Sequence, residues 1–159
     1  MSATSEQVGN RGRELFRQGF CCAESVLQAV AENCGIKSGI IPAIATGFCG
    51  GLGRTGRICG AVTGGVLGLN LVFGRSSHTE SPDQNARVVQ AFLKECELQF
   101  GALDCERLIG CRLDTPEGHQ FFVDNKIRQQ KCEGFVESAG RVACELIEKQ
   151  TEQERARKQ

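Results

Sequence analysis

Apolar residues recur at helical spacing along most of the chain, and turn-forming residues separate the periodic segments. Residues Ser5 to Gln18 predict a first helix, which the Gly19-Phe20 step interrupts. A second helix is predicted to begin at Cys22 and to end at Gly35, because glycine commonly follows a helix C-terminus. A short apolar segment, Ala43 to Phe48, comes after Pro42.

The glycine-rich run from Cys49 to Arg57 predicts a loop that leads into a helix starting at Cys59. The most apolar stretch, Ala61 to Phe73, falls short of the roughly 20 apolar residues that cross a bilayer. We therefore interpret it as a buried core helix and expect no membrane insertion. One face of this helix carries small residues, which let another backbone approach closely: Gly60, Ala61, Gly64, Gly65 and Gly68.

After a polar turn, residues 81–83 (Ser-Pro-Asp) form the N-terminus of an amphipathic helix that ends at Gly101. Asp104 is the expected N-cap of a short helix whose first residue is Cys105. The apolar side chains of the longer helix are predicted to face the core at Val88, Val89, Phe92, Leu93 and Leu98.

The last part of the chain predicts a connection from Arg112 to Gly118, a short helix from His119 to Gln130, and a final amphipathic helix preceded by Cys132. No repeat, second domain or alternating strand pattern occurs. The pattern predicts an all-α fold, a compact single-domain helical bundle over residues 1–159 with a glycine-rich loop and cysteines at helix N-termini. Residues 1–10 and 150–159 are expected to be frayed ends.

Charge and length exclude several classes of function. Lysine plus arginine number 19 and aspartate plus glutamate number 19, so no net charge attracts nucleic acid or an anionic bilayer. The first residues lack the basic start and apolar run of a secretion signal, so we expect a cytoplasmic protein. A chain of 159 residues can bury a core without crosslinks.

The chain has ten cysteines. Without a predicted secretion signal, a disulfide framework is disfavoured, which leaves metal or cluster ligation, redox chemistry or inert buried thiols. Four cysteines, 37, 46 and 27 residues apart, each begin a predicted helix, where free N–H groups favour a thiolate and lower the cysteine pKa: Cys22, Cys59, Cys105 and Cys132. If the fold brings them together, they suit a four-thiolate iron–sulfur cluster or a pair of reactive dithiols.

The other cysteines fall into two groups. Cys21, Cys49 and Cys111 are candidates for extra ligands or resolving thiols, and a bond between Cys21 and Cys22 is disfavoured. Three cysteines within or at the ends of predicted helices are interpreted as buried structural thiols: Cys34, Cys96 and Cys144.

Two further signals are weak. Residues Gly51 to Gly56 match the dinucleotide-binding fingerprint G-x-G-x-x-G, but no strand–helix–strand pattern accompanies them. We therefore interpret these residues as a tight turn that lets backbone amides approach sulfur or a neighbouring helix. Arg54 and Arg57 could neutralise a thiolate or a cluster, although loop arginines are usually solvated. His78 and His119 have no partner at ligand spacing and are interpreted as ordinary polar residues.

Four pieces of the chain, in order, resemble the C_GCAxxG_C_C family of redox-active proteins: FRQGFCCAESVLQAV, GFCGGLGRTGRICGAVTGGVLGL, CERLIG and KCEGFVESAGRVACELIE. The likeness runs from Leu15 to Glu148 and is most specific over Cys59 to Gly64. It implies a small helical fold with a prokaryotic electron-transfer or redox role, and four defining cysteines, Cys22, Cys59, Cys105 and Cys132. A similar module in split-Soret type cytochromes is associated with an iron–sulfur centre, but this chain has no Cys-x-x-Cys-His haem attachment site.

The favoured hypothesis is an electron-transfer or redox-sensing protein with an iron–sulfur cluster on these four cysteines, supported by the backbone of Gly60 and Gly64. One alternative is a thiol-disulfide oxidoreductase without a metal, in which pairs of the same cysteines exchange. Another is a zinc-stabilised or structural module that binds another protein. Whether the protein is an enzyme stays open between these alternatives. We expect a redox partner protein, and a homodimer would suit the small-residue helix.

Overall fold

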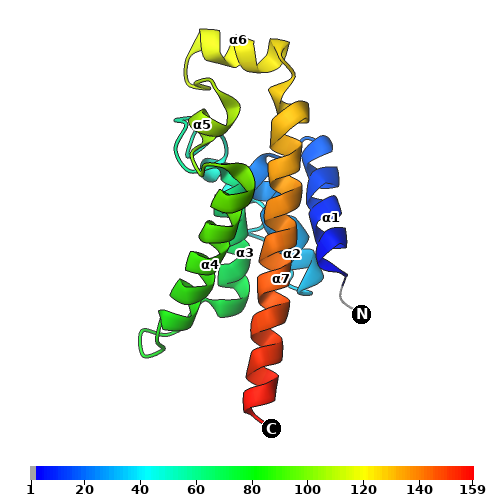
Figure 1. Cartoon of the computed structure of the whole chain (residues 1–159), viewed down its shortest axis with the longest axis vertical. Coiled ribbons are helices and arrows are strands. Elements are labelled where there is room, and N and C mark those ends of the chain that lie inside the picture. Colours follow the sequence, from blue (N-terminus) through cyan, green and yellow to red (C-terminus); the bar gives the residue numbers. More distant parts are fainter. Residues whose placement is uncertain (1–2) are drawn as a thin grey trace.

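Seven α-helices, one 3₁₀ helix and one π-helical segment form the regular structure of residues 3–159, the part of the chain that the computed structural model describes (Figure 1). These residues contain no β-strand, only an isolated antiparallel bridge between Ile58 and Asp104. The all-α prediction is confirmed. The elements in chain order are α1 (Ser5–Arg17), α2 (Cys22–Asn33), η1 (Ala43–Phe48), α3 (Gly60–Phe73), α4 (Asp83–Phe100), α5 (Cys105–Ile109), α6 (Pro116–Asp124), η2 (Arg128–Cys132) and α7 (Glu133–Arg157).

Helix α7 runs through the bundle, and α1, α2, α3 and α4 all pack against it (Figure 1). The buried residues of α7 lie in its first half, where Val136, Ala139 and Ala143 recur at the spacing of one helix face and are fully buried. The other end of the bundle, away from the C-terminus, carries α5 and α6 (Figure 1). The bundle therefore has a packed middle and a distinct end capped by short elements.

The core is largely apolar and consists of one large cluster, which contains Phe92 and Leu69, and a smaller one, which contains Leu27. Phe92, Leu27 and Leu69 are its largest fully buried side chains, and burying each contributes about 1.5–3 kcal/mol. The prediction for α4 was correct at Phe92 but wrong at Leu98, which is 72% exposed. Leu98 lies two residues beyond the buried Cys96, and two helical steps turn a side chain by about 200° to the outer face.

The N-terminal helix is fixed by a capping box. The Thr4 N–H donates to Gln7 Oε1 at 2.8 Å, and the Gln7 N–H donates to Thr4 Oγ1 at 3.3 Å. Helix α1 begins at Ser5 and Val8 is buried in the core, so residues 5–10 are helical and packed where a frayed end was expected. Met1 and Ser2 lie outside the described residues. Helix α7 likewise continues to Arg157.

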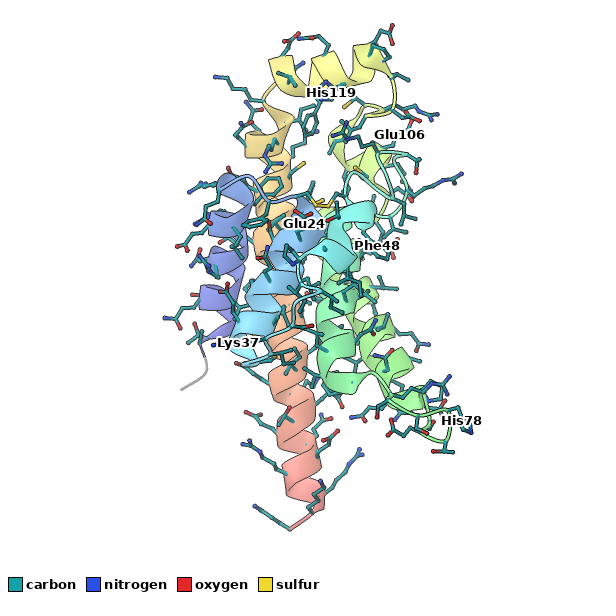
Figure 2. All side chains as sticks on the ribbon, turned by 180° about the vertical axis from the view of Figure 1, so that it is seen from behind. Glu24, Lys37, Phe48, His78, Glu106 and His119 are labelled. Atoms are coloured by element: carbon teal, nitrogen blue, oxygen red, sulfur yellow. A yellow bond between two sulfur atoms is a disulfide. The ribbon has the colours of Figure 1, made fainter. Side chains whose placement is uncertain are left out.

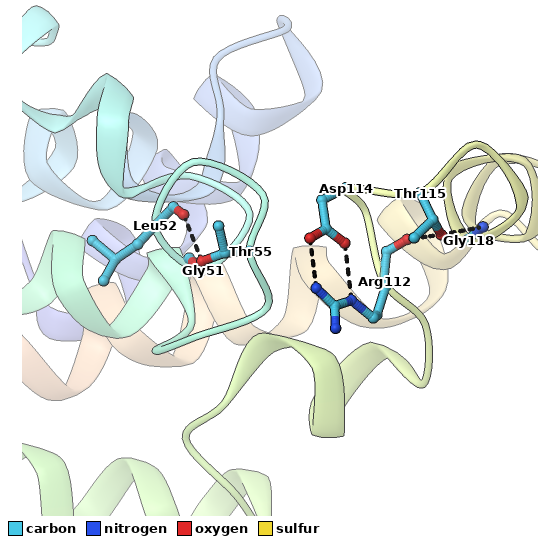
Figure 3. Close-up of polar contacts among 7 residues, drawn as sticks. All are labelled: Gly51, Leu52, Thr55, Arg112, Asp114, Thr115 and Gly118. Atoms are coloured by element: carbon cyan, nitrogen blue, oxygen red, sulfur yellow. Dashed lines mark hydrogen bonds and ion pairs between the residues drawn. The ribbon is translucent and has the colours of Figure 1, made fainter.

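Helix α6 begins three residues before the predicted start at His119. Thr115, in the predicted connection, is its N-cap and accepts the Gly118 N–H at 3.1 Å (Figure 3). Pro116 stands at the first helical position, where a backbone N–H would have no partner within the helix; proline has no N–H, so it fits there. Arg112 and Asp114 form an ion pair at 2.6 Å just before this cap (Figure 3). The Thr-Pro signal marks the helix start, and the prediction overlooked it.

Helices α2 and α3 approach each other closely because α3 carries glycine where they meet. A Cβ on Gly64 would lie 2.6 Å from the Ala23 carbonyl oxygen, and one on Gly68 would lie 3.0 Å from Val30 Cβ. Gly65 leaves room for the ring of Phe92 on α4. The predicted small-residue face is confirmed. The same helix is buried in the core, and no helix within residues 3–159 combines the length and apolarity that a membrane span needs.

This contact predicts that Gly64→Ala lowers the free energy of unfolding by about 1–3 kcal/mol, because the new methyl group would push against the α2 backbone. Urea unfolding followed by circular dichroism measures the change. Gly134→Ala is the matched control, since a Cβ there meets no atom within 4 Å, and it should stabilise the helix by up to about 1 kcal/mol. Equal effects of the two substitutions would contradict the close contact.

Candidate cysteine site

A cavity of about 270 Å³ opens at the end of the bundle that carries α5 and α6. It is far larger than the roughly 30 Å³ that one water molecule takes in the liquid. Much of its wall is apolar, formed by Phe16, Ala61, Leu108, Ile109, Leu113, Phe122 and Phe135. Six of the ten cysteines also line it: Cys21, Cys22, Cys49, Cys59, Cys105 and Cys132. The four cysteines singled out in the sequence therefore share one cavity.

Two of these cysteines lie at the meeting N-termini of α2 and α3. Cys22 is the first residue of α2, and Cys59 is the N-cap of α3. Gly60 lies so close to α2 that a Cβ on it would collide with Cys22 Sγ and approach the Phe48 carbonyl oxygen to 3.1 Å. The approach of the two helices therefore brings Cys22 to the start of α3.

Cys105 is joined to Cys59 through the backbone. The Cys59 N–H donates to the Leu103 carbonyl at 2.7 Å, and the Cys105 N–H donates to the Arg57 carbonyl at 2.6 Å. These two bonds flank the antiparallel bridge between Ile58 and Asp104. Short, reciprocal bonds of this kind set the start of α5 beside the start of α3.

Cys132 reaches the cavity from another direction. It directly precedes α7, as predicted, but it also ends the π-helical segment η2, so the backbone before it is already helical. Arg128 of η2 donates to the carbonyls of Phe16 at 2.6 Å and Phe20 at 3.0 Å. This ties η2 to the turn that leads into α2. Cys132 therefore lines the cavity without lying at a free helix N-terminus.

The four thiols interact electrostatically with one another. Burial, the largest cause, raises the pKa of Cys59 to about 12, and a thiolate at Cys22 raises it further. Burial likewise raises the pKa of Cys105 to about 12, with added repulsion from Cys59 and Cys22. The pKa of Cys132 is raised by burial and then by the other three. Every pair among the four is thus close enough to repel when ionised.

The expected lowering of these pKa values is wrong for the site without a bound cation. Backbone N–H groups of Gly50 and Ala23 do favour the Cys22 thiolate, and those of Ala61 and Val62 favour the Cys59 thiolate. Burial outweighs them, so the pKa of Cys22 is also raised. The apolar cavity disfavours negative charge more strongly than helix N-termini support it.

The sulfurs of the four cysteines are spread around the cavity and not gathered at a point. Among residues 3–159, the one group of three or more potential ligand atoms within 4.8 Å of one another consists of Cys21, Glu24 and Cys49. Cys21 and Cys49 form a disulfide, with Cα atoms 6.0 Å apart. The cavity is thus lined by four free cysteines and by one disulfide-bonded pair.

The glycine-rich loop wraps the same end of the bundle, and its interpretation as a tight turn that approaches sulfur is confirmed. A Cβ on Gly51, whose φ is +70°, would lie 2.7 Å from Cys105 Cβ, so only glycine fits there. The Thr55 hydroxyl fixes the turn, lying 2.9 Å from the Gly51 carbonyl and 2.8 Å from the Leu52 carbonyl (Figure 3). Arg54, expected to be solvated, is exposed but lines the cavity edge.

The remaining cysteines lie elsewhere. Cys96 and Cys144 are fully buried in the core, as predicted, whereas Cys34 is half-buried at the C-terminus of α2. Cys111 is half-buried and is not part of the cavity wall, although its thiolate would repel that of Cys105. The structure therefore leaves Cys111 outside the set that lines the cavity.

A family model described as "Putative redox-active protein (C_GCAxxG_C_C)" matches residues 20–146. The chain belongs to this family. The C_GCAxxG_C_C match encloses all six cysteines that line the cavity, and it confirms the resemblance found in the sequence. No curated protein and no solved structure matches the chain.

Sequence reasoning missed two residues of this C_GCAxxG_C_C cavity. Arg128 stacks its guanidinium 3.6 Å from the centre of the Phe16 ring. Burial raises the pKa of Cys22 and Cys132, and the charge of Arg128 offsets part of that rise. His119, interpreted as ordinary, lines the cavity from α6 and is labelled in Figure 2. Neither residue lies in a local motif. Only the folding of α6 and η2 over the cavity brings them there.

The buried thiols predict that metal-free, reduced protein loses stability as the pH rises above about 9. Unfolded cysteines ionise near pH 8.5, whereas the pKa of Cys59, Cys96 and Cys105 is raised to about 12 in the folded chain. Between these values the folded state binds more protons, so the free energy of unfolding falls by roughly 1 kcal/mol per pH unit for each thiol.

Urea unfolding with reductant, at about pH 7, 8.5 and 10, measures this slope. Cys96→Ala removes one buried thiol that is not part of the cavity and should make the slope shallower. A pH slope that Cys96→Ala leaves unchanged would argue against raised thiol pKa values.

Proposed function

We propose that this C_GCAxxG_C_C protein holds an iron–sulfur cluster on Cys22, Cys59, Cys105 and Cys132 and exchanges electrons with a partner protein. The observation that carries the proposal is the convergence of these four thiols on one largely apolar cavity. A redox role agrees with the description of the family. Four cysteine ligands leave no position for a substrate, which favours electron transfer over turnover.

The spread of the sulfurs favours a polynuclear centre over a single zinc ion. With Zn–S bonds of about 2.3 Å, the sulfurs of a tetrahedral zinc site lie roughly 3.8 Å apart. The four cavity cysteines do not form a group within 4.8 Å. A cluster of several iron atoms spans wider separations and also suits a cavity of about 270 Å³.

The raised pKa values favour a cationic occupant over exchange among the four thiols. Thiol–disulfide exchange needs a thiolate, and burial keeps these cysteines protonated near neutral pH. Metal ions invert that balance, because ligation deprotonates a thiol outright. An iron–sulfur cluster bound there would supply one-electron transfer.

The chain's own groups have defined duties around such a centre. The four cysteines act as ligands, and backbone N–H groups of Gly50 and Ala61 reach the sulfurs of Cys22 and Cys59. Arg128 adds a positive charge beside Cys22 and Cys132. The phenylalanine and leucine side chains of the wall keep water away, which strengthens each of these electrostatic effects.

The proposal predicts that Cys59→Ser loses most of the bound iron and acid-labile sulfide, because it removes one of four ligands. Anaerobically purified protein should show broad absorbance near roughly 400 nm that the variant lacks. Cys96→Ser, which changes a buried cysteine away from the cavity, should keep its iron if it remains folded by circular dichroism. Equal iron in wild type and Cys59→Ser, or none in reconstituted wild type, would overturn the assignment.

The position of Arg128 predicts that Arg128→Gln makes the reduction potential more negative. A positive charge stabilises the reduced, more negative centre, and losing about 1 kcal/mol of that stabilisation corresponds to roughly 40 mV for one electron. Arg128→Lys keeps the charge and should change the potential less. Anaerobic redox titration measures both, and a shift to more positive potential in Arg128→Gln would contradict this role.

A further inference from the structure

The disulfide between Cys21 and Cys49 is a second sulfur centre beside the four-thiol set. It joins the N-cap of α2 to the first residue of the glycine-rich loop, 28 residues later. Both cysteines line the cavity and both are half-buried, so solvent reaches this pair. The neighbouring thiols Cys59 and Cys105 are buried.

This disulfide has no evident duty in holding the bundle together. The fully buried side chains that stabilise the fold, such as Phe92 and Leu27, lie along the helices, whereas the disulfide links two segments at the cavity. A chain of 159 residues buries enough surface to fold without a crosslink. Cys34 and Cys144 lie close enough for their charges to interact, yet both are free. The bond at Cys21 and Cys49 is therefore a local feature of the cavity.

Glu24 holds the two cysteine-bearing segments together independently of the S–S bond. Its carboxylate accepts the Cys21 N–H at 2.9 Å and the Thr46 hydroxyl at 2.6 Å, so it links the start of α2 to η1. Its ligand oxygen and both sulfurs lie within 4.8 Å of one another, and Figure 2 labels Glu24 at this end of the bundle. Two thiols formed by reduction would thus remain close enough to bond again.

We propose that Cys21 and Cys49 form a thiol–disulfide exchange site for an external dithiol, separate from the four cavity thiols. A thiolate of the dithiol attacks one sulfur of the pair, forming a mixed disulfide as the Cys21–Cys49 bond breaks and the other cysteine leaves. The second thiolate of the dithiol then releases the first cysteine. The dithiol is oxidised to its disulfide, and the pair takes up its two electrons and two protons.

The exchange site adjoins the proposed electron-transfer site through the backbone. Gly50, whose N–H favours the Cys22 thiolate, directly follows Cys49 in the chain. Opening the disulfide therefore removes one covalent restraint from the loop that carries this hydrogen bond, while the Glu24 contacts remain. The exchange itself needs no iron–sulfur cluster, so it goes beyond the proposed function and can be tested independently.

The test follows the two cysteines in the folded full-length chain. The protein is treated with dithiothreitol or with reduced thioredoxin at equal dithiol concentration, and iodoacetamide labelling with peptide mass spectrometry reports each thiol. Cys21 and Cys49 should become labelled together while circular dichroism stays native, and oxidised dithiothreitol should close them again. Faster opening with dithiothreitol would indicate a small-molecule dithiol as the reductant, and faster opening with thioredoxin would indicate a protein dithiol. A pair that opens only after denaturation, or that is free without reductant, overturns the proposal.

Variants separate exchange from structural roles. The wild-type protein should form a stable mixed disulfide, through Cys21 or Cys49, with a reduced thioredoxin variant that lacks its second, resolving cysteine. Cys21→Ser and Cys49→Ser, which leave no disulfide to attack, should form none, whereas Cys34→Ser should leave the exchange unchanged. Glu24→Ala should shift the dithiol–disulfide equilibrium toward the open pair by about tenfold, and Glu24→Gln, which keeps a hydrogen-bond acceptor, by much less. Exchange should persist in Cys59→Ser, so a failed cluster proposal leaves this one standing, and exchange lost in that variant overturns it.

Discussion

The close approach of α2 and α3 is the constraint on which the cysteine site depends. It exists because Gly64 leaves the α3 backbone bare where it meets Ala23, and because Gly60 leaves space for Cys22 Sγ. The approach sets two helix N-termini side by side, and the bridge between Ile58 and Asp104 then adds the start of α5. A methyl group on Gly60 would collide with Cys22 Sγ, so the packing of α2 against α3 and the geometry of the site depend on the same residues.

Burial makes ionisation of the cavity thiols unfavourable, and this favours an occupant that carries positive charge. Four thiols that share an apolar cavity repel one another when ionised, and the pKa of Cys59 and Cys105 rises to about 12. The N–H groups and the charge of Arg128 offset only part of that cost. The cationic centre of several metal atoms that we propose would supply the missing positive charge, whereas a single zinc ion would need the four sulfurs closer together.

Local sequence signals predicted the helices well and singled out four cysteines that line one cavity, because each signal depends on residues close in the chain. Glycine at Gly101, helical periodicity and the family pieces are such signals. The net direction of the thiol pKa values was mispredicted, because burial depends on elements far apart in the sequence. The same reason hid Arg128, which reaches Phe16 only after η2 folds over the cavity, and the bond between Cys21 and Cys49, which joins residues 28 apart.

The two sulfur centres differ in the property that decides their chemistry. The four cavity thiols are held apart, which suits ligation more than bonding to one another. Cys59 and Cys105 are buried, which hinders attack by another molecule, whereas Cys22 and Cys132 are half-buried. Cys21 and Cys49 are bonded to each other and half-buried, which suits attack and hinders ligation. If both proposals hold, one cavity would carry one-electron and two-electron chemistry without competition for the same sulfurs. The glycine after Cys49, whose N–H faces Cys22, provides the physical link through which the state of one centre can alter the other.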